Sequence, residues 1–169
     1  MRDLVILVDE NDKEVGTMDK MEAHLQGILH RAFSVIIRND KQEILIQQRA
    51  LHKYHSGGLW ANSCCSHPFP GESNLEGAKR RLSEEMGIQA VLSHSGSFLY
   101  RCEFDNGLTE FEFDHVFNGH SNDDPKINPE EVNAYQWIDL ASLMADMKQH
   151  PERYTFWFHE LLIKGFLNS

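Results

Sequence analysis

The segment at residues 73–87 constrains the fold most, because it specifies a helix together with both of its ends. Ser73, followed three residues later by Glu76, forms a capping box, and Gly87 provides the left-handed residue that commonly ends a helix. Apolar residues recur between these ends at helical spacing: Leu75, Ala78, Leu82 and Met86. The pattern predicts a helix with one buried face, which must pack against another layer of structure.

Short β-type runs on both sides of this helix predict strands at residues 4–8, 32–37, 43–48, 97–104, 108–117 and 132–138. Polar turns at 38–41 and 105–107 indicate two hairpins. Further helices are expected at 142–148 and 155–166. Neither a repeat nor a linker divides the chain, so we expect one domain over residues 1–169. The mixture predicts an α/β (or α+β) mixed-sheet sandwich with flanking helices.

Charge and cysteine content narrow the function. The net charge of −10 argues against a nucleic-acid-binding protein. The chain has neither a membrane-spanning apolar run nor a signal-peptide layout, so we expect a cytoplasmic protein without a membrane partner. Three cysteines, two of them adjacent at Cys64 and Cys65, do not indicate a disulfide framework. Ten histidines raise the expectation of a metal site.

An acidic strand is expected at residues 110–114. Side chains alternate in a strand, so Glu110, Glu112 and Asp114 share one face and Phe111 and Phe113 share the other. Stacked carboxylates repel each other unless cations or protons compensate. Taken alone, the motif favours an ordinary solvent-facing strand surface.

Two other segments carry possible metal or catalytic chemistry. Residues 62–68 read Asn-Ser-Cys-Cys-Ser-His-Pro, which places Cys65 two residues before His67, and His24 and His30 flank an apolar run. Each is weak by itself, since a free cysteine is often a small buried apolar residue. The spacing does not fit a zinc finger, and nothing local supports a cysteine protease.

Residues 66–88 follow a degraded Nudix box, GX5EX7REUXEEXGU, in which U is aliphatic. Ser66 stands at the first glycine, and Arg81 replaces the glutamate that follows the arginine. The matching positions are Glu72, Arg80, Leu82, Glu84, Glu85, Gly87 and Ile88. Exchanging a metal-binding carboxylate for a cation suits a site that binds a diphosphate without cleaving it.

Together these motifs resemble type I isopentenyl-diphosphate isomerases, which have a Nudix-like fold. The resemblance runs in order from about residue 20 to 157, through residues 23–24, 29–33, 48–50, 62–68, the degraded box and 110–112. In that family three histidines and two glutamates bind a divalent ion (Mn, Mg or Zn). The matching residues here are His24, His30, His67, Glu110 and Glu112. A second ion, Mg, accompanies the substrate diphosphate, and Glu85 matches its protein ligand.

The resemblance also implies catalytic and substrate-binding residues. The catalytic cysteine falls on Cys65 rather than Cys64, the catalytic glutamate on Glu112, and the assisting aromatic residue on Tyr100. The implied diphosphate contacts are Lys20, Arg49, Lys53, Ser66 and Arg81. The aromatic residue that closes over the hydrocarbon is Trp157.

The implied activity converts isopentenyl to dimethylallyl diphosphate in isoprenoid biosynthesis. It protonates an alkene and removes a proton from another carbon. The resemblance suggests Glu112, assisted by Tyr100 and the metal, on the donor side and Cys65 on the opposite face, while Trp157 shields the carbocation. The alternatives are a Nudix pyrophosphohydrolase, which would explain neither Cys65 nor the histidines, and a non-enzymatic metal-binding module. Whether the protein is a monomer or a dimer stays open.

Overall fold

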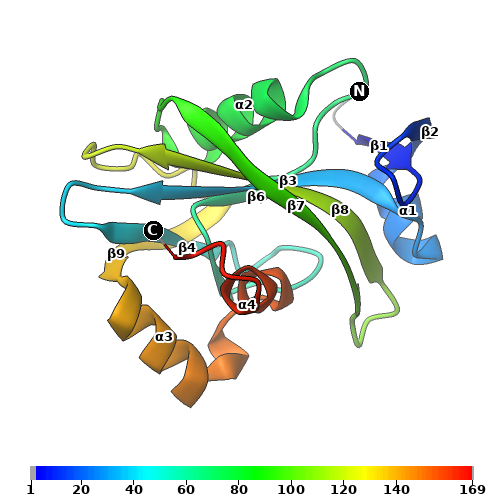
Figure 1. Ribbon diagram of the computed structural model, residues 1–169. Helices are drawn as coiled ribbons and strands as arrows, with labels where there is room; N and C mark the ends of the chain where they lie inside the picture. Colours follow the sequence, from blue (N-terminus) through cyan, green and yellow to red (C-terminus); the bar gives the residue numbers. More distant parts are fainter. Residues whose placement is uncertain (1–2, 169) are drawn as a thin grey trace.

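A computed structural model describes residues 3–168, which form nine strands, four α-helices and one 3₁₀ helix (Figure 1). The elements in chain order are β1 (Leu4–Val8), β2 (Glu14–Asp19), α1 (Lys20–Gln26), β3 (His30–Arg38), β4 (Glu43–Arg49), β5 (Trp60–Ala61), β6 (Cys64–Ser66), α2 (Asn74–Met86), β7 (Leu92–Glu103), β8 (Thr109–His120), β9 (Val132–Asp139), α3 (Leu140–Gln149), η1 (Pro151–Arg153) and α4 (Phe156–Ile163).

Strand β3 is the centre of a mixed sheet. It pairs in parallel with β8 over residues 30–38 and antiparallel with β6 over residues 33–35. Strand β7 extends the sheet as the antiparallel partner of β8, while β1 and β4 join β3 near its two ends. The predicted mixed-sheet α/β class is therefore confirmed.

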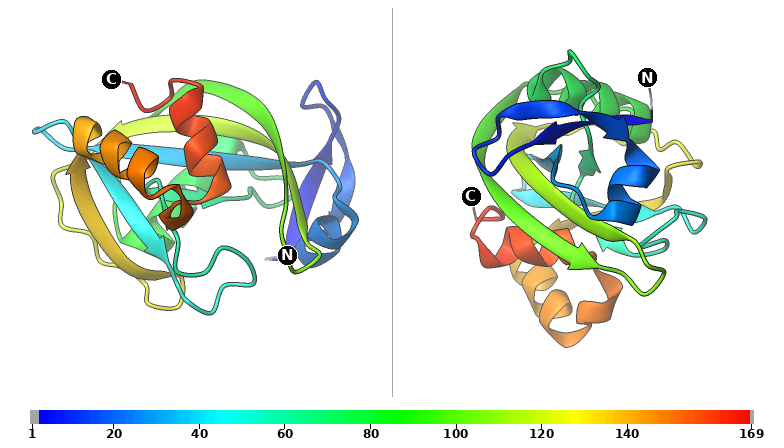
Figure 2. Two further views of the ribbon diagram at one scale, coloured as in Figure 1. Left: turned by 90° about the horizontal axis from the view of Figure 1, so that it is seen from below. Right: turned by 90° about the vertical axis from the view of Figure 1, so that its right-hand side faces the viewer.

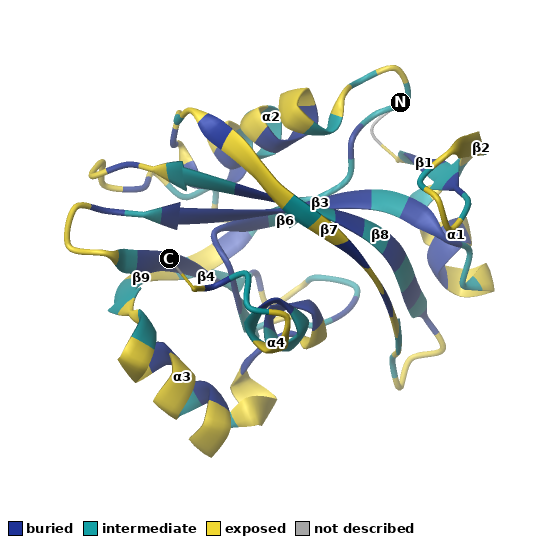
Figure 3. Ribbon diagram, viewed as in Figure 1, coloured by how far each residue is buried: buried dark blue, intermediate teal, exposed yellow. Residues whose placement is uncertain are grey.

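Helices cover the two faces of this sheet, with α2 on one side and α3 and α4 on the other (Figure 2). Phe33, Val35 and Ile37 of β3 belong to the hydrophobic cluster under α2, whereas Ile36 belongs to the cluster under α4. This alternation follows from the two-residue period of a strand, and it buries most of β3 (Figure 3). A strand covered on both faces provides a rigid support for any side chain at its ends.

Both predicted ends of the helix at residues 73–87 are confirmed. Ser73 and Glu76 form the reciprocal capping box, and Gly87 ends α2 with φ +64°. Ala78, Leu82 and Met86 are buried, but the placement of Leu75 on the core face is wrong, because Leu75 lies in the exposed first turn.

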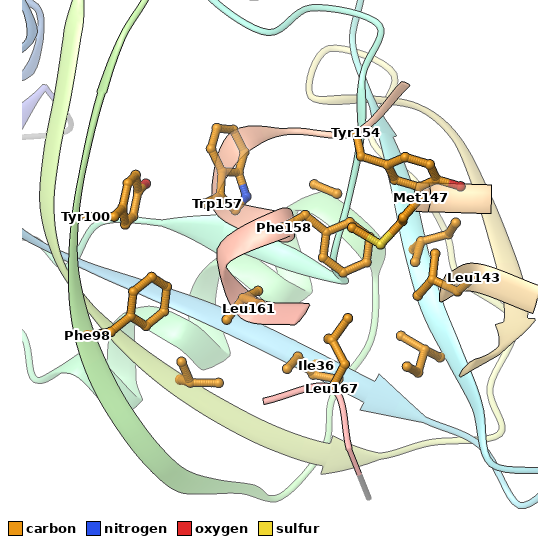
Figure 4. Close-up of a cluster of buried hydrophobic side chains, with 14 residues drawn as sticks. Ile36, Phe98, Tyr100, Leu143, Met147, Tyr154, Trp157, Phe158, Leu161 and Leu167 are labelled. Atoms are coloured by element: carbon orange, nitrogen blue, oxygen red, sulfur yellow. The ribbon is translucent and has the colours of Figure 1, made fainter. Parts of the chain in front are cut away.

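Helix α4 closes the second face and carries a predicted site residue. Phe158 and Leu161 are fully buried in the same cluster as Ile36, and Trp157 and Tyr100 belong to that cluster too (Figure 4). Two of the aromatic residues expected at the site are therefore fixed by the hydrophobic core.

The hairpin expected at residues 32–48 is only partly correct. The turn is present, but β3 and β4 diverge after it and share one registered pair, Arg38 with Ile44, because β6 and β8 take the edges of β3. The sequence pattern also missed β2 and α1, in which exposed residues predominate.

Candidate metal centre and active site

The sheet register brings the predicted site residues together. His30 on β3 lies opposite Glu112 on β8, and Tyr100 on β7 lies opposite the same glutamate. On the other edge of β3, Ser34 lies opposite Cys65 of β6. The chain then continues from β6 directly into His67. Residues distant in sequence are therefore aligned by backbone pairing alone.

The acidic face of β8 is the buried face. Glu110 and Glu112 are each 4% exposed and Asp114 is 2% exposed, whereas Phe111 and Phe113 on the opposite face are only partly buried. The solvent-facing interpretation, which the motif alone favoured, is therefore wrong. A strand whose acidic face is buried requires partners for its three carboxyl groups.

The hydrogen bonds of His24 and His30 show that the centre fits a cation. Nδ1 of His24 donates to the carbonyl oxygen of Lys20 at 2.6 Å, and Nδ1 of His30 donates to that of Ile28 at 2.8 Å. In a neutral imidazole the other nitrogen, Nε2, then carries a lone pair. His30 Nε2 lies 3.0 Å from Glu112 Oε2, and the buried Nε2 of His24 has no hydrogen-bond partner among residues 3–168. A cation between these atoms satisfies all of them.

His67 completes this set. Its Nε2 lies 2.8 Å from Glu112 Oε2, and the donor atoms of His24, His30, His67 and Glu112 all lie within 4.8 Å of one another. Burial outweighs the attraction of Glu112 and lowers the pKa of His67 to about 4, so its imidazole is neutral at pH 7, as a metal ligand must be. Three histidines and a carboxylate form a donor set for a divalent ion such as Mn or Zn.

Both metal-site glutamates are held in the ionised form. Burial would raise the pKa of Glu112, but its contacts with the His67 and His30 imidazoles outweigh burial and hold the pKa well below its ordinary value. Burial and Glu112 likewise oppose the ionisation of Glu110, but His24 and His55 lower its pKa. Tyr100 donates its hydroxyl hydrogen bond to either carboxylate, at 2.6 Å to Glu112 Oε1.

Cys65 is held as a thiol on the wall of the same cavity. Both amide hydrogens of Asn62 are taken by the backbone carbonyls of Val35 and Cys64, so its Oδ1 faces Cys65 Sγ at 3.0 Å and can only accept. Burial and the nearby Asp114 raise the pKa of Cys65 well above its ordinary value. Cys64, by contrast, is fully buried and packs in the cluster under α2.

A basic cluster lines the same cavity. Lys20, Lys53 and Arg81 all line it, and burial together with the charges of Lys53 and Arg81 lowers the pKa of Lys20. Glu131 pairs with Lys53 and lies 3.3 Å from Arg81. An excess of cations in a partly buried cluster favours an anionic ligand.

Arg80 and Glu85 of the degraded box both line the cavity, and each is held by further contacts. Arg80 binds Glu72 and Glu84 and stacks on Phe69, which ties α2 to the loop after His67. Glu85 lies in the cavity wall, where Arg81 donates to it at 2.7 Å and Gln47 at 3.0 Å. Among the described residues Glu85 belongs to neither histidine cluster, so any ion that it binds is a second one.

Every predicted site residue except His24 and His30 lines this one cavity, including Ser66, Arg49 and Trp157. His24 and His30 lie fully buried behind Glu110 and Glu112. The guanidinium group of Arg49 lies over the Trp157 ring, 5.1 Å from its centroid. The predicted site is therefore brought together in one place.

Sequence reasoning missed several residues of this site. Tyr54, His55 and Glu131 line the cavity, and Ser34 donates to Asp114 at 2.8 Å while contacting Cys65 at 3.4 Å. Only the histidine-rich character of residues 52–67 could have indicated His55. His115 on β8 contacts His94 of β7 and Asp12 of the β1–β2 turn, and it is not among the residues that line the cavity.

Comparison with known proteins identifies the family. A NUDIX domain model matches residues 28–158. The isopentenyl-diphosphate Delta-isomerase of Pectobacterium atrosepticum is 52% identical over 91% of this chain and 86% of its own, and isopentenyl-diphosphate Delta-isomerase 2 of Aromatoleum aromaticum is 50% identical over 93% and 83%. The chain belongs to the isopentenyl-diphosphate Delta-isomerase family of Nudix proteins.

Solved structures share the Nudix fold of this isomerase-family chain. The crystal structure of DR0079 from Deinococcus radiodurans has a TM-score of 0.70 at 20% sequence identity, covering 87% of this chain and 90% of that one, which shows likeness of fold alone. None of the helices in residues 3–168 is long and apolar enough to cross a lipid bilayer.

Proposed function

We propose that this protein is an isopentenyl-diphosphate isomerase, which converts isopentenyl to dimethylallyl diphosphate in isoprenoid biosynthesis. The observation that carries the proposal is one cavity lined by the Cys65 thiol, the Glu112 carboxylate of a histidine cluster, and a basic cluster. The family supplies the name of the substrate, and the cavity carries groups suited to its diphosphate and to its alkene.

The diphosphate end of the substrate is assigned to Lys20, Arg49, Lys53 and Arg81, with Ser66 beside them. Arginine and lysine bind phosphate oxygens through charge-assisted hydrogen bonds. Glu131 keeps Lys53 and Arg81 paired and in place before substrate binds. Glu85 is the carboxylate available to a magnesium ion that arrives with the diphosphate.

His24, His30, His67, Glu110 and Glu112 are assigned as the ligands of the resident divalent ion, Mn, Mg or Zn. An ion held by these residues would compensate the negative charge of Glu110 and Glu112. The Tyr100 hydroxyl holds the second oxygen of Glu112 and so sets its orientation.

Cys65 and Glu112 carry the two proton transfers. The thiol holds a proton that it already donates to Asn62, whereas Glu112 is ionised. We therefore assign Cys65 as the donor to the terminal alkene carbon and Glu112 as the base that removes a proton from the neighbouring methylene. This order reverses the one that the family resemblance suggested, because the histidines around Glu112 favour its charged form.

The carbocation between these steps needs an anhydrous, electron-rich wall. Trp157 and Tyr100 are 3% and 6% exposed, and Trp157 lines the cavity. An aromatic face stabilises a desolvated cation by up to about 2 kcal/mol.

A location in the cytoplasm and a monomeric or dimeric state remain predictions from the sequence.

The decisive experiment incubates the protein with isopentenyl diphosphate and Mg²⁺ and follows the substrate by ¹H NMR. We expect dimethylallyl diphosphate without release of inorganic phosphate or pyrophosphate. Release of either one, without isomerisation, would instead support the pyrophosphohydrolase. Metal binding with no turnover of any diphosphate would support the non-enzymatic module.

A further inference from the structure

A fourth histidine, His55, approaches the metal centre from the loop between β4 and β5. Its side chain is 3% exposed, and its ring stacks on Phe104 with a centroid distance of 4.5 Å and an interplanar angle of 10°. The loop is tightly folded: a Cβ at Gly57 would lie 2.6 Å from the carbonyl oxygen of Leu51. The ring of His55 is therefore fixed by packing before any ion or substrate binds.

The two ring nitrogens of His55 have different partners from those of the other histidines. Nδ1 of His24 and of His30 each face a backbone carbonyl, which can only accept, so each Nε2 is left with a lone pair. Nδ1 of His55 instead faces the hydroxyl of Ser56 at 3.2 Å. A hydroxyl can donate, so Nδ1 of His55 can be the acceptor and Nε2 can carry the proton.

That Nε2 points at the second metal-site carboxylate. It lies 3.0 Å from Glu110 Oε2, a normal hydrogen-bond distance. His24 Nε2 lies 3.6 Å from the same oxygen, too far for a good hydrogen bond but suitable for two ligands of one ion. Each carboxylate oxygen has two lone pairs, so Oε2 can accept from His55 and still bind an ion.

His55 also stands outside the main ligand cluster. Among residues 3–168, the donor atoms of His24, His30, His67 and Glu112 all lie within 4.8 Å of one another, whereas His55 and Glu110 form a second such group with His24. An ion centred in the larger cluster does not include His55, and Glu110 can join its ligands only if the carboxylate is held toward His24, the residue that both groups share. Glu110 is then held from two sides, by Tyr100 on Oε1 and by His55 on Oε2.

We propose that His55 is a positioning residue of the metal centre, which donates Nε2–H to Glu110 and holds this carboxylate in its metal-binding orientation. The assignment rests on the metal centre of the proposed function. Partners of this kind, behind the ligands, typically change metal affinity by about 10- to 100-fold when they are removed.

Two substitutions separate the hydrogen bond from the packing. His55→Phe keeps a ring on Phe104 but removes the donor, whereas His55→Gln keeps an N–H donor without the ring. His52→Gln, at an exposed position three residues earlier in the same loop, is the matched control. The chelator-treated proteins are titrated with Mn²⁺ by calorimetry. We expect His55→Phe to weaken Mn²⁺ binding by about 10- to 100-fold. His55→Gln should retain most of the affinity, and His52→Gln all of it.

Two further measurements test whether His55 acts through Glu110 and not as a metal ligand. In a Glu110→Gln background, His55→Phe should cause no additional loss of Mn²⁺ affinity, because the carboxylate that it positions is gone. Pulsed EPR of the Mn²⁺-loaded wild-type protein should detect the imidazoles of His24, His30 and His67 alone.

Three results would overturn the proposal: unchanged Mn²⁺ affinity in His55→Phe, equal losses in the Phe and Gln variants, or a fourth coordinated imidazole in the wild type. The imidazole count needs no variant, so it remains decisive if a variant does not fold. If His55-dependent Mn²⁺ binding were found in a protein without isomerase activity, the proposed function would fail and this inference would stand.

Discussion

Replacing Arg81 with methionine should weaken substrate binding far more than turnover. The Arg81 side chain is 14% exposed, lines the cavity, and bonds to Glu85 at 2.7 Å and to Glu131 at 3.3 Å. In the proposed complex its guanidinium group binds the diphosphate. The substitution removes that cation and also leaves the charges of two glutamates less compensated at the diphosphate end of the cavity.

The size of the effect follows from the bonds lost. A hydrogen bond to a charged group contributes about 1.5–3 kcal/mol, and each 1.36 kcal/mol is a factor of ten, so KM should rise about 10- to 150-fold. The uncompensated charges of Glu85 and Glu131 act in the same direction, which favours the upper part of this range. The value of kcat should change less, because Arg81 is placed at the diphosphate and not at the alkene.

Steady-state kinetics with isopentenyl diphosphate measure this effect, and Lys79→Met is the control. Lys79 is exposed on the same helix and lies outside the cavity lining. Its loss should leave KM nearly unchanged. A KM for Arg81→Met close to that of the wild type would refute the diphosphate role of Arg81.

Three other predictions concern the metal centre. Tyr100→Phe removes the hydroxyl that donates to Glu110 and Glu112, and it should lower kcat by about 10-fold or more while the protein stays folded, as circular dichroism can check. Chelation should lower the melting temperature by roughly 5–10 °C and added Mn²⁺ should restore it, since an ion at about 100 times its Kd stabilises by about 2.7 kcal/mol; an unchanged melting temperature would speak against a resident ion. Metal-free protein should lose stability as the pH falls from 6.5 towards 4. Burial lowers the pKa of His67 to about 4 in the folded protein, so in this pH range the unfolded chain binds a proton at His67 that the folded protein does not. Urea unfolding at pH 7.5 and 5.5 measures this loss, which should shrink in His67→Gln.

The sequence predicted the helix and most strands because their signals are local. The capping box at Ser73 and the stop at Gly87 act within a few residues, and they appear in the structure as expected. The pairing of β3 with β8 and β6 depends on contacts far apart in the chain, so the turn at residues 38–41 suggested a hairpin that hardly forms. Leu75 shows the same limit, because helical spacing does not reveal which turns of the helix are covered by the rest of the protein.

The candidate site was predictable mainly where the family motif carries it. The burial of Glu110 and Glu112 could not be derived from their alternation, because a solvated and a buried acidic face have the same period. His55 and Glu131 were missed for a different reason: each lies in an irregular segment, and only the folded chain brings them to Glu110 and Arg81.

The adjacent cysteines provide the most direct test of the central claim, that the Cys65 thiol and the Glu112 carboxylate act together on one alkene. Cys64→Ala and Cys65→Ala should be compared by ¹H NMR of dimethylallyl diphosphate formation, with metal content measured on the same samples. Cys65→Ala should lose about 100-fold or more in rate with its metal content unchanged, whereas Cys64→Ala should retain turnover. Full activity in Cys65→Ala, or loss confined to Cys64→Ala, would contradict the account.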